Sequence, residues 1–450
     1  MKTLIEGGRI VTGDGSTDRP GNLWLDGDRI TAVDWDDTPA EPDVGVRIDA
    51  RGSVVMPGVI NNHAHGCSYG PLFPSAAPAL PRDKVRANLD RHLMQGETTT
   101  LNVCGLTTPD EVAAAADGHP LRVAASTGHF APTVAAAQAV DGAGLSEKHI
   151  AMTAEAAVAA GAVAIGEIGS GHTLGGGGQD YKYIPERVKQ ATGIDIGVDI
   201  ARGLKLTVLA GRYGGVEGED LETVMERGGL TGVISVDELR TLISDTVMPP
   251  IAHALDEFPL ATKFAAESGL PVMFHSSSVS RDALLAVARE YAGKATLVAG
   301  HANHNTYTVD DSVATARQLR ELGVVLDVST LDGVLTRWRN DMDRTEALAS
   351  EGLIDTISTD YANGHWDSIL EGIHYLVSHK FCALAGAVAM ATGNVARNYQ
   401  ALAGDRGLLQ AGKLADVVIA DAVNPGRVQT VLIGGEVVVR SGWPQWSRAA

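Results

Sequence analysis

The sequence predicts an α/β fold: a (β/α)8 TIM barrel with a small β-sandwich domain built from both ends of the chain. Three observations predict it. Short β-branched runs alternate with Ala-rich helical segments through the middle of the 450 residues. There are eight such runs, the number that closes a barrel of this type. Both ends instead alternate apolar and polar residues between glycine turns, which is typical of hairpin-connected strands.

The two ends are predicted to form one domain, residues 1–56 together with residues 402–450. The first part contains the strand-like stretches "TLIEGGRIVTGDG", "GNLWLDGDRITAVD" and "VRIDARGSVVMPG", separated by Gly and Asp turns. The last part, "LADVVIADAVNPGRVQTVLIGGEVVVRSG", repeats this style with a hairpin at "GG". We therefore expect these two separated segments to flank a central domain.

Residues 57–401 are predicted to form the barrel. Its strands are expected in the runs "VVMPGVINNH", "TTTLNVCG", "LRVAASTG", "AVAIGEIG", "LPVMFHSS", "ATLVAGHA", "GVVLDVS" and "LIDTISTD". Apolar runs without strict alternation suit strands that are covered on both faces, and alternation with helices implies parallel pairing. In such a barrel the functional groups lie at the carboxyl ends of the strands.

One segment does not fit a plain barrel, the stretch of about residues 170–262 between the fourth and fifth strands. It is too long for a simple connection and is expected to be an insertion. Its "GGGG", residues 175–178, lacks the "GK[ST]" ending of a phosphate-binding loop, which favours a flexible hinge. The mixed segments "LAGRYGGVEGEDLE" and "MPPIAHALDEFP" leave a lid and an oligomer contact both open.

Composition excludes several classes of protein. Acidic side chains number 55 against 36 basic ones, a net charge of −19, so we expect no nucleic-acid partner. No run of 18 apolar residues occurs, so no membrane association is expected. The three cysteines form no CxxC motif and no paired framework, which favours thiols in a reducing compartment. We expect a cytoplasmic protein that acts on a small molecule.

Metal-capable side chains occur at the ends of five different predicted strands. They are His63 and His65, Glu167, His275, His301 and Asp360. Residues i and i+2 of a strand point the same way, so "HAH" presents two imidazoles to one ion. Neutral imidazole and carboxylate together suit zinc, iron or manganese, and the absence of a cysteine cluster argues against a structural thiolate site.

The pattern resembles the amidohydrolase superfamily over nearly the whole chain. The resemblance lies in the "G..V.PG.I..H.H" entry, the "G.TTT" second strand, the histidine on strand six, the aspartate on strand eight and the closing "G.L..GKLADVVI.D". Within it the sequence looks most like enamidase, because "IGEIG" at 165–169 resembles its bridging-glutamate strand. "LVAGHANH" and "AVAMATGNVARNY" resemble two further segments of that family. The insertion after residue 170 departs from enamidase.

The resemblance implies a site with two divalent ions, for which we expect zinc, with iron or manganese as alternatives. His63, His65 and Asp360 would hold one ion, and His275 and His301 the other. Glu167 would bridge them, where many relatives use a carboxylated lysine. Two ions about 3.5–4 Å apart can share a water whose pKa falls to about 7. Asp360 would also carry the proton from the bridging hydroxide to the departing nitrogen. The resemblance also implies a homodimer or homotetramer.

The remaining histidines have weaker assignments. His129 in "STGHF" is placed to stabilise the developing oxyanion, although a loop histidine without a catalytic task is the alternative. His172, His304 and His365 lie in strand-end loops and are candidate substrate contacts. Periodicity places His301, rather than His304, at the end of strand six. No function is assigned to His92, His374 and His379 on predicted helices, or to His119 and His149, which are expected in solvent loops. Cys67 is expected to be a buried thiol.

Three classes of function remain. The first is binuclear hydrolysis of a C–N bond in a cyclic amide or imide, with acyclic N-acyl compounds as a variant. The second is a mononuclear deaminase of a cyclic amidine, which typically carries a glutamate three residues after the strand-five histidine. Here "HSSS" at 275–278 lacks that acid. The third is a non-enzymatic descendant, which would have lost ligand histidines, and none is missing.

Overall fold

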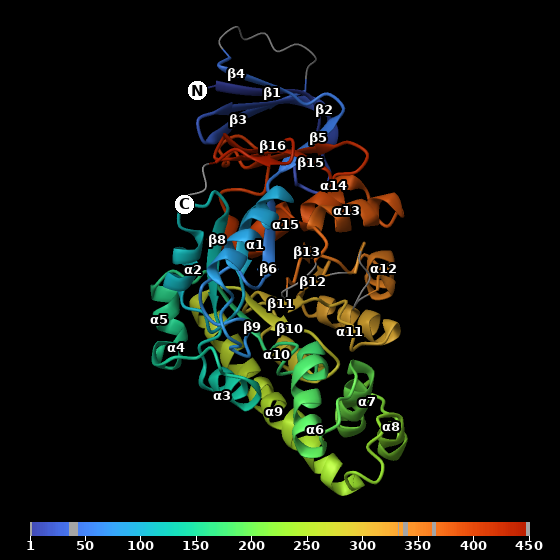
Figure 1. Ribbon diagram of the computed structural model, residues 1–450. Helices are drawn as coiled ribbons and strands as arrows, with labels where there is room; N and C mark the ends of the chain where they lie inside the picture. The colour runs from blue at the N-terminus through green and yellow to red at the C-terminus, as the bar shows by residue number, and fades with distance from the viewer. Residues whose placement is uncertain (1, 36–43, 332, 336–340, 362–365, 447–450) are drawn as a thin grey trace.

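The computed structural model describes residues 2–35, 44–331, 333–335, 341–361 and 366–446. Figure 1 shows a barrel between two additions: a β domain containing both ends of the chain, and a group of helices at the opposite end. Among the helices described, none combines the length and the apolar character needed to cross a membrane.

The β domain is one hydrogen-bonded sheet of nine strands. The N-terminal strands are β1 (Lys2–Val11), β2 (Asp18–Asp26), β3 (Arg29–Asp34), β4 (Val46–Asp49) and β5 (Ser53–Pro57), and the C-terminal ones are β14 (Val417–Asp421), β15 (Val428–Ile433), β16 (Glu436–Arg440) and β17 (Trp443–Pro444). Antiparallel pairing of β5 with β14 joins the two groups, with Val55 opposite Ile419. The groups lie one over the other around buried Ile5, Leu23 and Leu432. The predicted β domain from both termini is confirmed.

The barrel consists of eight parallel strands, as predicted. They are β6 (Val59–Ala64), β7 (Glu97–Asn102), β8 (Arg122–Thr127), β9 (Ala164–Ile168), β10 (Val272–His275), β11 (Leu297–Gly300), β12 (Val325–Ser329) and β13 (Thr356–Ser358). A parallel bridge between Ala64 and Tyr361 links the last strand's end to the first. Six of the barrel strands lie within a predicted run, whereas β6 extends one residue past its run, to Ala64, and β7 begins one residue before its run, at Glu97. The first run divides at Gly58, because its first half, β5, pairs in the β domain.

Helices cover the outside of the barrel. They are α1 (Arg82–Met94), α2 (Pro109–Ala116), α3 (Ala131–Val140), α4 (Glu147–Ala151), α5 (Ala154–Ala159), α10 (Arg281–Glu290), α11 (Val309–Glu321), α12 (Asp343–Ser350), α13 (Ile369–Ser378), α14 (Leu384–Met390), α15 (Gly393–Asn398) and α16 (Gln400–Ala403). Their starts follow ordinary capping chemistry: Thr108 and Glu111 form a capping box at α2 with Pro109 in the first turn.

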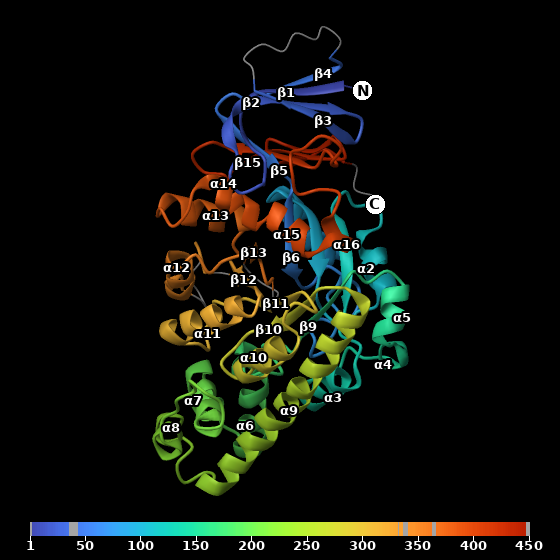
Figure 2. The same ribbon diagram turned by 180° about the vertical axis from the view of Figure 1, so that it is seen from behind.

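The insertion is helical, and its last helix belongs to the barrel as well. It contains the π-helical turn η1 (Gln179–Tyr183), α6 (Ile184–Thr192), α7 (Val198–Leu209), α8 (Leu221–Arg227) and α9 (Val236–Ser268). The 33-residue α9 begins at a capping box of Ser235 and Glu238 and ends at Gly269, whose φ is 71°. Its first half supports α7 and α8, and its second half runs along the barrel wall, where Phe258 meets Phe274 (Figure 2). The expected end of the insertion, about residue 262, therefore lies inside this helix.

Candidate metal centre

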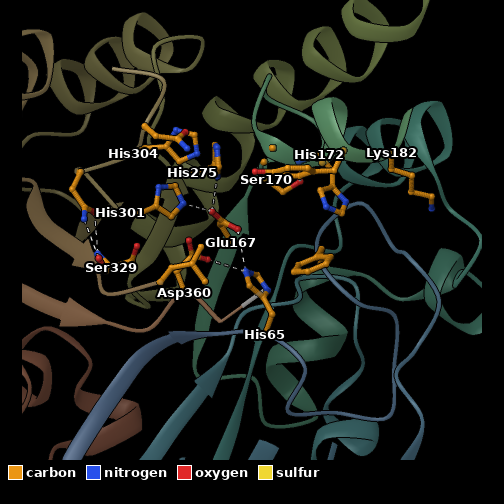
Figure 3. Close-up of a pocket in the computed structure, with 18 residues that line it drawn as sticks. His65, Glu167, Ser170, His172, Lys182, His275, His301, His304, Ser329 and Asp360 are labelled. Carbon is orange, nitrogen blue, oxygen red and sulfur yellow. Dashed lines mark hydrogen bonds and ion pairs between the residues drawn. The ribbon is translucent and has the colours of Figure 1, made fainter. Parts of the chain in front are cut away.

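Six side chains with metal-binding atoms meet at the carboxyl end of the barrel. His63 and His65 come from the end of β6, Glu167 from β9, His275 from the last position of β10, His301 from the residue after β11 and Asp360 from two residues past β13. Five of them are buried, while the Asp360 side chain keeps 15% of its exposure. Figure 3 shows most of this cluster around Glu167. The structure therefore brings together the residues that the sequence placed on five strand ends.

The carboxylate of Glu167 lies between two sets of nitrogen atoms. Its Oε1 is 2.9 Å from His275 Nδ1 and 2.9 Å from His301 Nε2. Its Oε2 is 3.5 Å from His65 Nε2 and 3.9 Å from His63 Nε2. Each oxygen thus faces a different pair of histidines, which is the arrangement of a bridging ligand.

Asp360 completes one side of this cluster. Its Oδ1 lies 3.3 Å from His63 Nε2 and 3.7 Å from His65 Nε2. Three groups of side chains could each hold an ion: His63 with His65 and Glu167, His63 with His301 and Asp360, and Glu167 with His275 and His301. These groups overlap in His63, Glu167 and His301.

The buried nitrogen atoms of the cluster fit a metal ion. Within the described residues, both ring nitrogens of His63, Nε2 of His275 and Nδ1 of His301 are buried without a hydrogen-bond partner. An unpaired buried polar atom is costly, and coordination to a cation is one way to satisfy it. Imidazole nitrogen and carboxylate oxygen are the donor set of zinc, iron and manganese sites.

The electrostatics keep the Glu167 carboxylate charged and divide the histidines around it into two kinds. Burial raises the pKa of Glu167, but hydrogen bonds with His275, His301 and His65 outweigh it and hold this pKa well below its ordinary value. Burial lowers the pKa of His63 well below its ordinary value and that of His275 to about 4. Burial also opposes charge on His65 and His301, but contacts that include Glu167 outweigh it and raise their pKa values to about 10 and about 9. An ionised carboxylate and a neutral imidazole are the forms that bind metals.

Two of the cluster residues have unusual backbone conformations. His301 has φ 39° and Asp360 has φ 44°, in the left-handed region that non-glycine residues rarely occupy. Such conformations cost about 1–3 kcal/mol and occur preferentially at functional sites. They turn both side chains inward at the point where each strand ends.

A hydrogen-bond network that the sequence did not reveal holds the end of β6. The backbone N–H groups of His63 and Thr359 both donate to Asn61 Oδ1, at 3.2 and 3.3 Å. The Asn61 amide donates to Glu97, which also lies 2.9 Å from His92 Nδ1. His92, left unassigned on its helix, thus supports β6 indirectly through Glu97 and Asn61. The polar pair "NN" inside an apolar strand was the available signal.

A cavity of about 250 Å³ opens over the cluster. Its lining includes His65, Glu167, His275, His301 and Asp360 on one side. His172 and His304, the predicted substrate contacts, line it as well, and Figure 3 shows them on opposite sides of Glu167. Below we call this space the metal-centre cavity.

His172 and His304 are both neutral hydrogen-bonding groups. Burial lowers the pKa of His172 to about 4 and that of His304 well below its ordinary value. His172 Nδ1 lies 2.6 Å from Ser75 Oγ, and its ring is 4.8 Å from that of Phe73. His172 and the loop that follows it belong to the insertion and line the cavity, so the insertion forms part of the cavity wall.

His129 and His365 are not part of this arrangement. His129 is buried with Nδ1 3.0 Å from Thr127 Oγ1, and the structure does not place it in the lining of the metal-centre cavity. Its oxyanion role stays a prediction. His365 lies outside the described residues.

Two histidines expected in solvent loops are in fact enclosed, which corrects that expectation. His149 lies in α4, with Nε2 3.1 Å from Glu111 Oε1, and the His119 side chain is 3% exposed, with Nε2 3.2 Å from Asp90. In each case a carboxylate about 30 to 40 residues earlier pairs with the ring.

Cys67 is buried, as expected, and Cys104, which the sequence analysis missed, has its Sγ 3.6 Å from His65 Nδ1.

The fold and the cluster together define a class: a parallel eight-stranded barrel with metal-capable side chains at its strand ends and a β domain built from both termini. Residues 218–438 are similar to the amidohydrolase family. The match extends from the insertion through β10 to β13 and into the β domain. No curated protein matches the sequence.

Several solved structures share the whole fold at low sequence identity. A beta-aspartyl dipeptidase from Fervidobacterium islandicum AW-1 is 14% identical, with a TM-score of 0.57 over 99% of both chains. A dihydropyrimidinase from Brevibacillus agri NCHU1002 is 14% identical, with a TM-score of 0.59 over 99% of this chain and 96% of that one. D-aminoacylase, described with a binuclear metal centre, is 15% identical, with a TM-score of 0.56 over 99% and 98%. At these identities the likeness concerns the fold alone.

Proposed function

We propose that this protein is a metal-dependent hydrolase that opens the C–N bond of a cyclic amide or imide at a centre of two divalent ions. The observation that carries this proposal is the placement of Glu167, whose two oxygens face different pairs of histidines. A single-ion site has no need of a carboxylate shared in this way.

The described residues divide into two ligand sets. His63, His65 and Asp360 would hold one ion and His275 with His301 the other, while Glu167 would bridge them. Zinc suits this donor set best, and iron and manganese are alternatives. When bound, such ions acidify water and polarise the carbonyl group of a substrate.

Asp360 is the residue that we assign to proton transfer. Its carboxylate is near His63 and His65, and it also lines the metal-centre cavity. Glu167 is almost fully buried, whereas Asp360 keeps part of its side chain exposed. Asp360 can therefore take a proton at the cluster and deliver it to a leaving nitrogen in the cavity.

A small cyclic substrate is supported by the size and lining of the cavity. About 250 Å³ is below the usual range for drug-sized ligands. Phe73 and Leu331 supply apolar surface, and His172 and His304 supply neutral hydrogen-bonding groups. The fold neighbours include a dihydropyrimidinase, and they also include a dipeptidase and D-aminoacylase, so an acyclic N-acyl compound is the alternative substrate.

Metal content tests the proposal before any substrate is known. Mass spectrometry of the native protein is expected to find about two ions per chain, as in other two-metal sites. Glu167→Ala and His63→Ala should each lower that number. His379→Ala is the matched control, because His379 is exposed and stacks on Tyr375 away from the cluster.

The same preparations should then be screened against cyclic amides, cyclic imides and N-acyl amino acids. Hydrolysis of a cyclic member that disappears in Glu167→Ala supports the proposal. One ion per chain, unchanged by Glu167→Ala, would contradict the bridging role and favour a mononuclear deaminase.

A further inference from the structure

His304 lies in the loop after β11, beside the candidate metal ligands but not among them. Its ring centroid is 4.9 Å from that of His275 and 5.1 Å from that of His301. The half-buried ring lines the metal-centre cavity, and its Nε2 has no hydrogen-bond partner among the described residues. Figure 3 shows this side chain next to His275, on the side of Glu167 away from His172. His304 is thus placed to meet a substrate held at the cluster.

The partners of Nδ1 determine which tautomer His304 adopts. The backbone N–H of Thr306 donates to His304 Nδ1 at 3.3 Å, so this nitrogen carries a lone pair. Thr306 Oγ1 is also 2.9 Å from Nδ1 and itself accepts a hydrogen bond from the backbone N–H of Ser278, at 3.1 Å. The hydroxyl hydrogen of Thr306 is therefore free to point at Nδ1. With Nδ1 accepting, the ring proton resides on Nε2.

Ser278 lies beside Thr306 and supports the contact between Thr306 and His304. It is the third residue after His275, where a deaminase of this architecture would carry its glutamate. Here its backbone N–H and its Oγ both bind Thr306, which in turn binds His304. The position that would supply an acid instead fixes the orientation of a neutral imidazole.

We propose that His304 is a catalytic hydrogen-bond donor, fixed as the Nε2–H tautomer by Thr306 and Ser278, that binds the carbonyl oxygen of the substrate. This inference rests on the proposed function and specifies its substrate class: compounds that present an uncharged carbonyl acceptor to the cavity. A fixed donor favours that acceptor and leaves the amino group of an amidine without a partner. The same donor stabilises negative charge that develops on the oxygen during attack.

Nitrogen NMR tests the tautomer independently of turnover. Histidine labelled with ¹⁵N in the metal-loaded protein gives long-range ¹H–¹⁵N patterns that distinguish the two tautomers, and His304→Gln identifies the signal. We expect the Nε2–H pattern in the wild type. Thr306→Val, which keeps the backbone donor but loses the hydroxyl, should introduce some of the other tautomer. A wild-type pattern with the proton on Nδ1 would overturn the proposal.

Binding of acetohydroxamate, a small carbonyl-bearing metal chelator, tests the contact. Calorimetry should show affinity at least about tenfold weaker in His304→Phe, because a hydrogen bond to a charged group is lost. His304→Gln keeps an N–H donor near the position of Nε2 and should bind within about threefold of the wild type. Metal content near the wild-type value in both variants shows that they fold. Equal affinity in wild type and His304→Phe overturns the proposal.

The two proposals fail in different ways. A wild-type protein without metal and without acetohydroxamate binding would refute the metal-dependent function, and with it the inference about His304. A wild-type protein that binds both, together with a His304→Phe variant of equal affinity, would refute the role of His304 alone.

Discussion

Lys205 and Asp180 form a buried ion pair, with Nζ 2.6 Å from Oδ1 and each side chain 3% exposed. Lys205 also donates to the backbone carbonyl oxygens of Gly175 and Gly176. Lys205 thereby connects the glycine stretch of residues 175–178 to helix α7. Two of these glycines line the metal-centre cavity. The stretch that the sequence suggested as a flexible hinge is therefore anchored by a charged side chain.

Removing Lys205 should strongly destabilise the fold. Among the described residues, Lys205→Met would leave the buried Asp180 with Arg202 as its charged partner, and breaking a buried pair costs about 3–5 kcal/mol. Urea denaturation measures the loss. Arg227→Met breaks a pair with Glu219 in which both side chains are about half exposed, and it should cost less than about 1 kcal/mol. Similar losses in both variants would show that the buried pair contributes little.

Glu257 should make the stability of the protein depend on pH. Burial raises the pKa of this α9 carboxyl to about 8, although hydrogen bonds from Thr133 and the Gly169 backbone lower it. Between the ordinary value of 4.5 and 8 the unfolded state loses a proton that the folded state keeps. Stability therefore falls as pH rises through this range.

Glu257→Gln should remove this dependence, because the amide stays neutral. The difference in thermal midpoint between the variant and the wild type should increase as the pH is raised from 5 to 8.5. This increase should correspond to at least about 1 kcal/mol in the free energy of unfolding. Asp256→Asn, at the exposed neighbouring position, serves as the control and should show no such trend. A constant difference between Glu257→Gln and wild type would mean that Glu257 is ionised in the folded protein.

Two histidines, His304 and His129, are alternative candidates for the residue that stabilises the oxyanion. If His304 is the donor, His304→Phe should lower kcat/KM by about 10²–10³, the usual effect of losing such a donor. His129→Phe should lower it less than about tenfold, since His129 is outside the lining of the cavity. Steady-state kinetics on the substrate found by screening decides between them. The reverse order would restore the role that the sequence suggested for His129.

Gly178 should be needed to position His172. A Cβ at Gly178 would lie 1.9 Å from His172 Cδ2 and 2.5 Å from its Nε2, so Gly178→Ala must displace this ring. We expect KM to rise about tenfold or more, because His172 lines the metal-centre cavity. Gly386→Ala is the control, since a Cβ there meets nothing within 4 Å. An unchanged KM in Gly178→Ala would exclude His172 from substrate binding.

The meeting of the six metal-capable side chains could be predicted because it depends on local rules. Parallel strands place their carboxyl ends on one face, and alternation places His63 and His65 on the same side of one strand. Neither rule requires knowledge of distant contacts. The eight strands could be located for the same reason, since each is a short apolar run between polar segments.

Pairings between distant residues could not be predicted from the sequence. His149 looked like a surface residue because its partner, Glu111, lies 38 positions earlier on another helix. Asn61 and Glu97 likewise come from neighbouring barrel strands, and their contact exists only after the sheet forms. His129 followed the correct strand but turns toward Thr127, which only the loop conformation determines.

Helix α9 joins the insertion to the wall of the barrel. One continuous helix serves both as the spine of the insertion and as part of the barrel wall, and at about 1.5 Å per residue it is about 50 Å long. It ends three residues before β10, the strand that carries His275. The outer end of the insertion is thus connected to the strand that carries His275 by one helix and a three-residue connection, so we expect a displacement of the insertion to change the position of this strand.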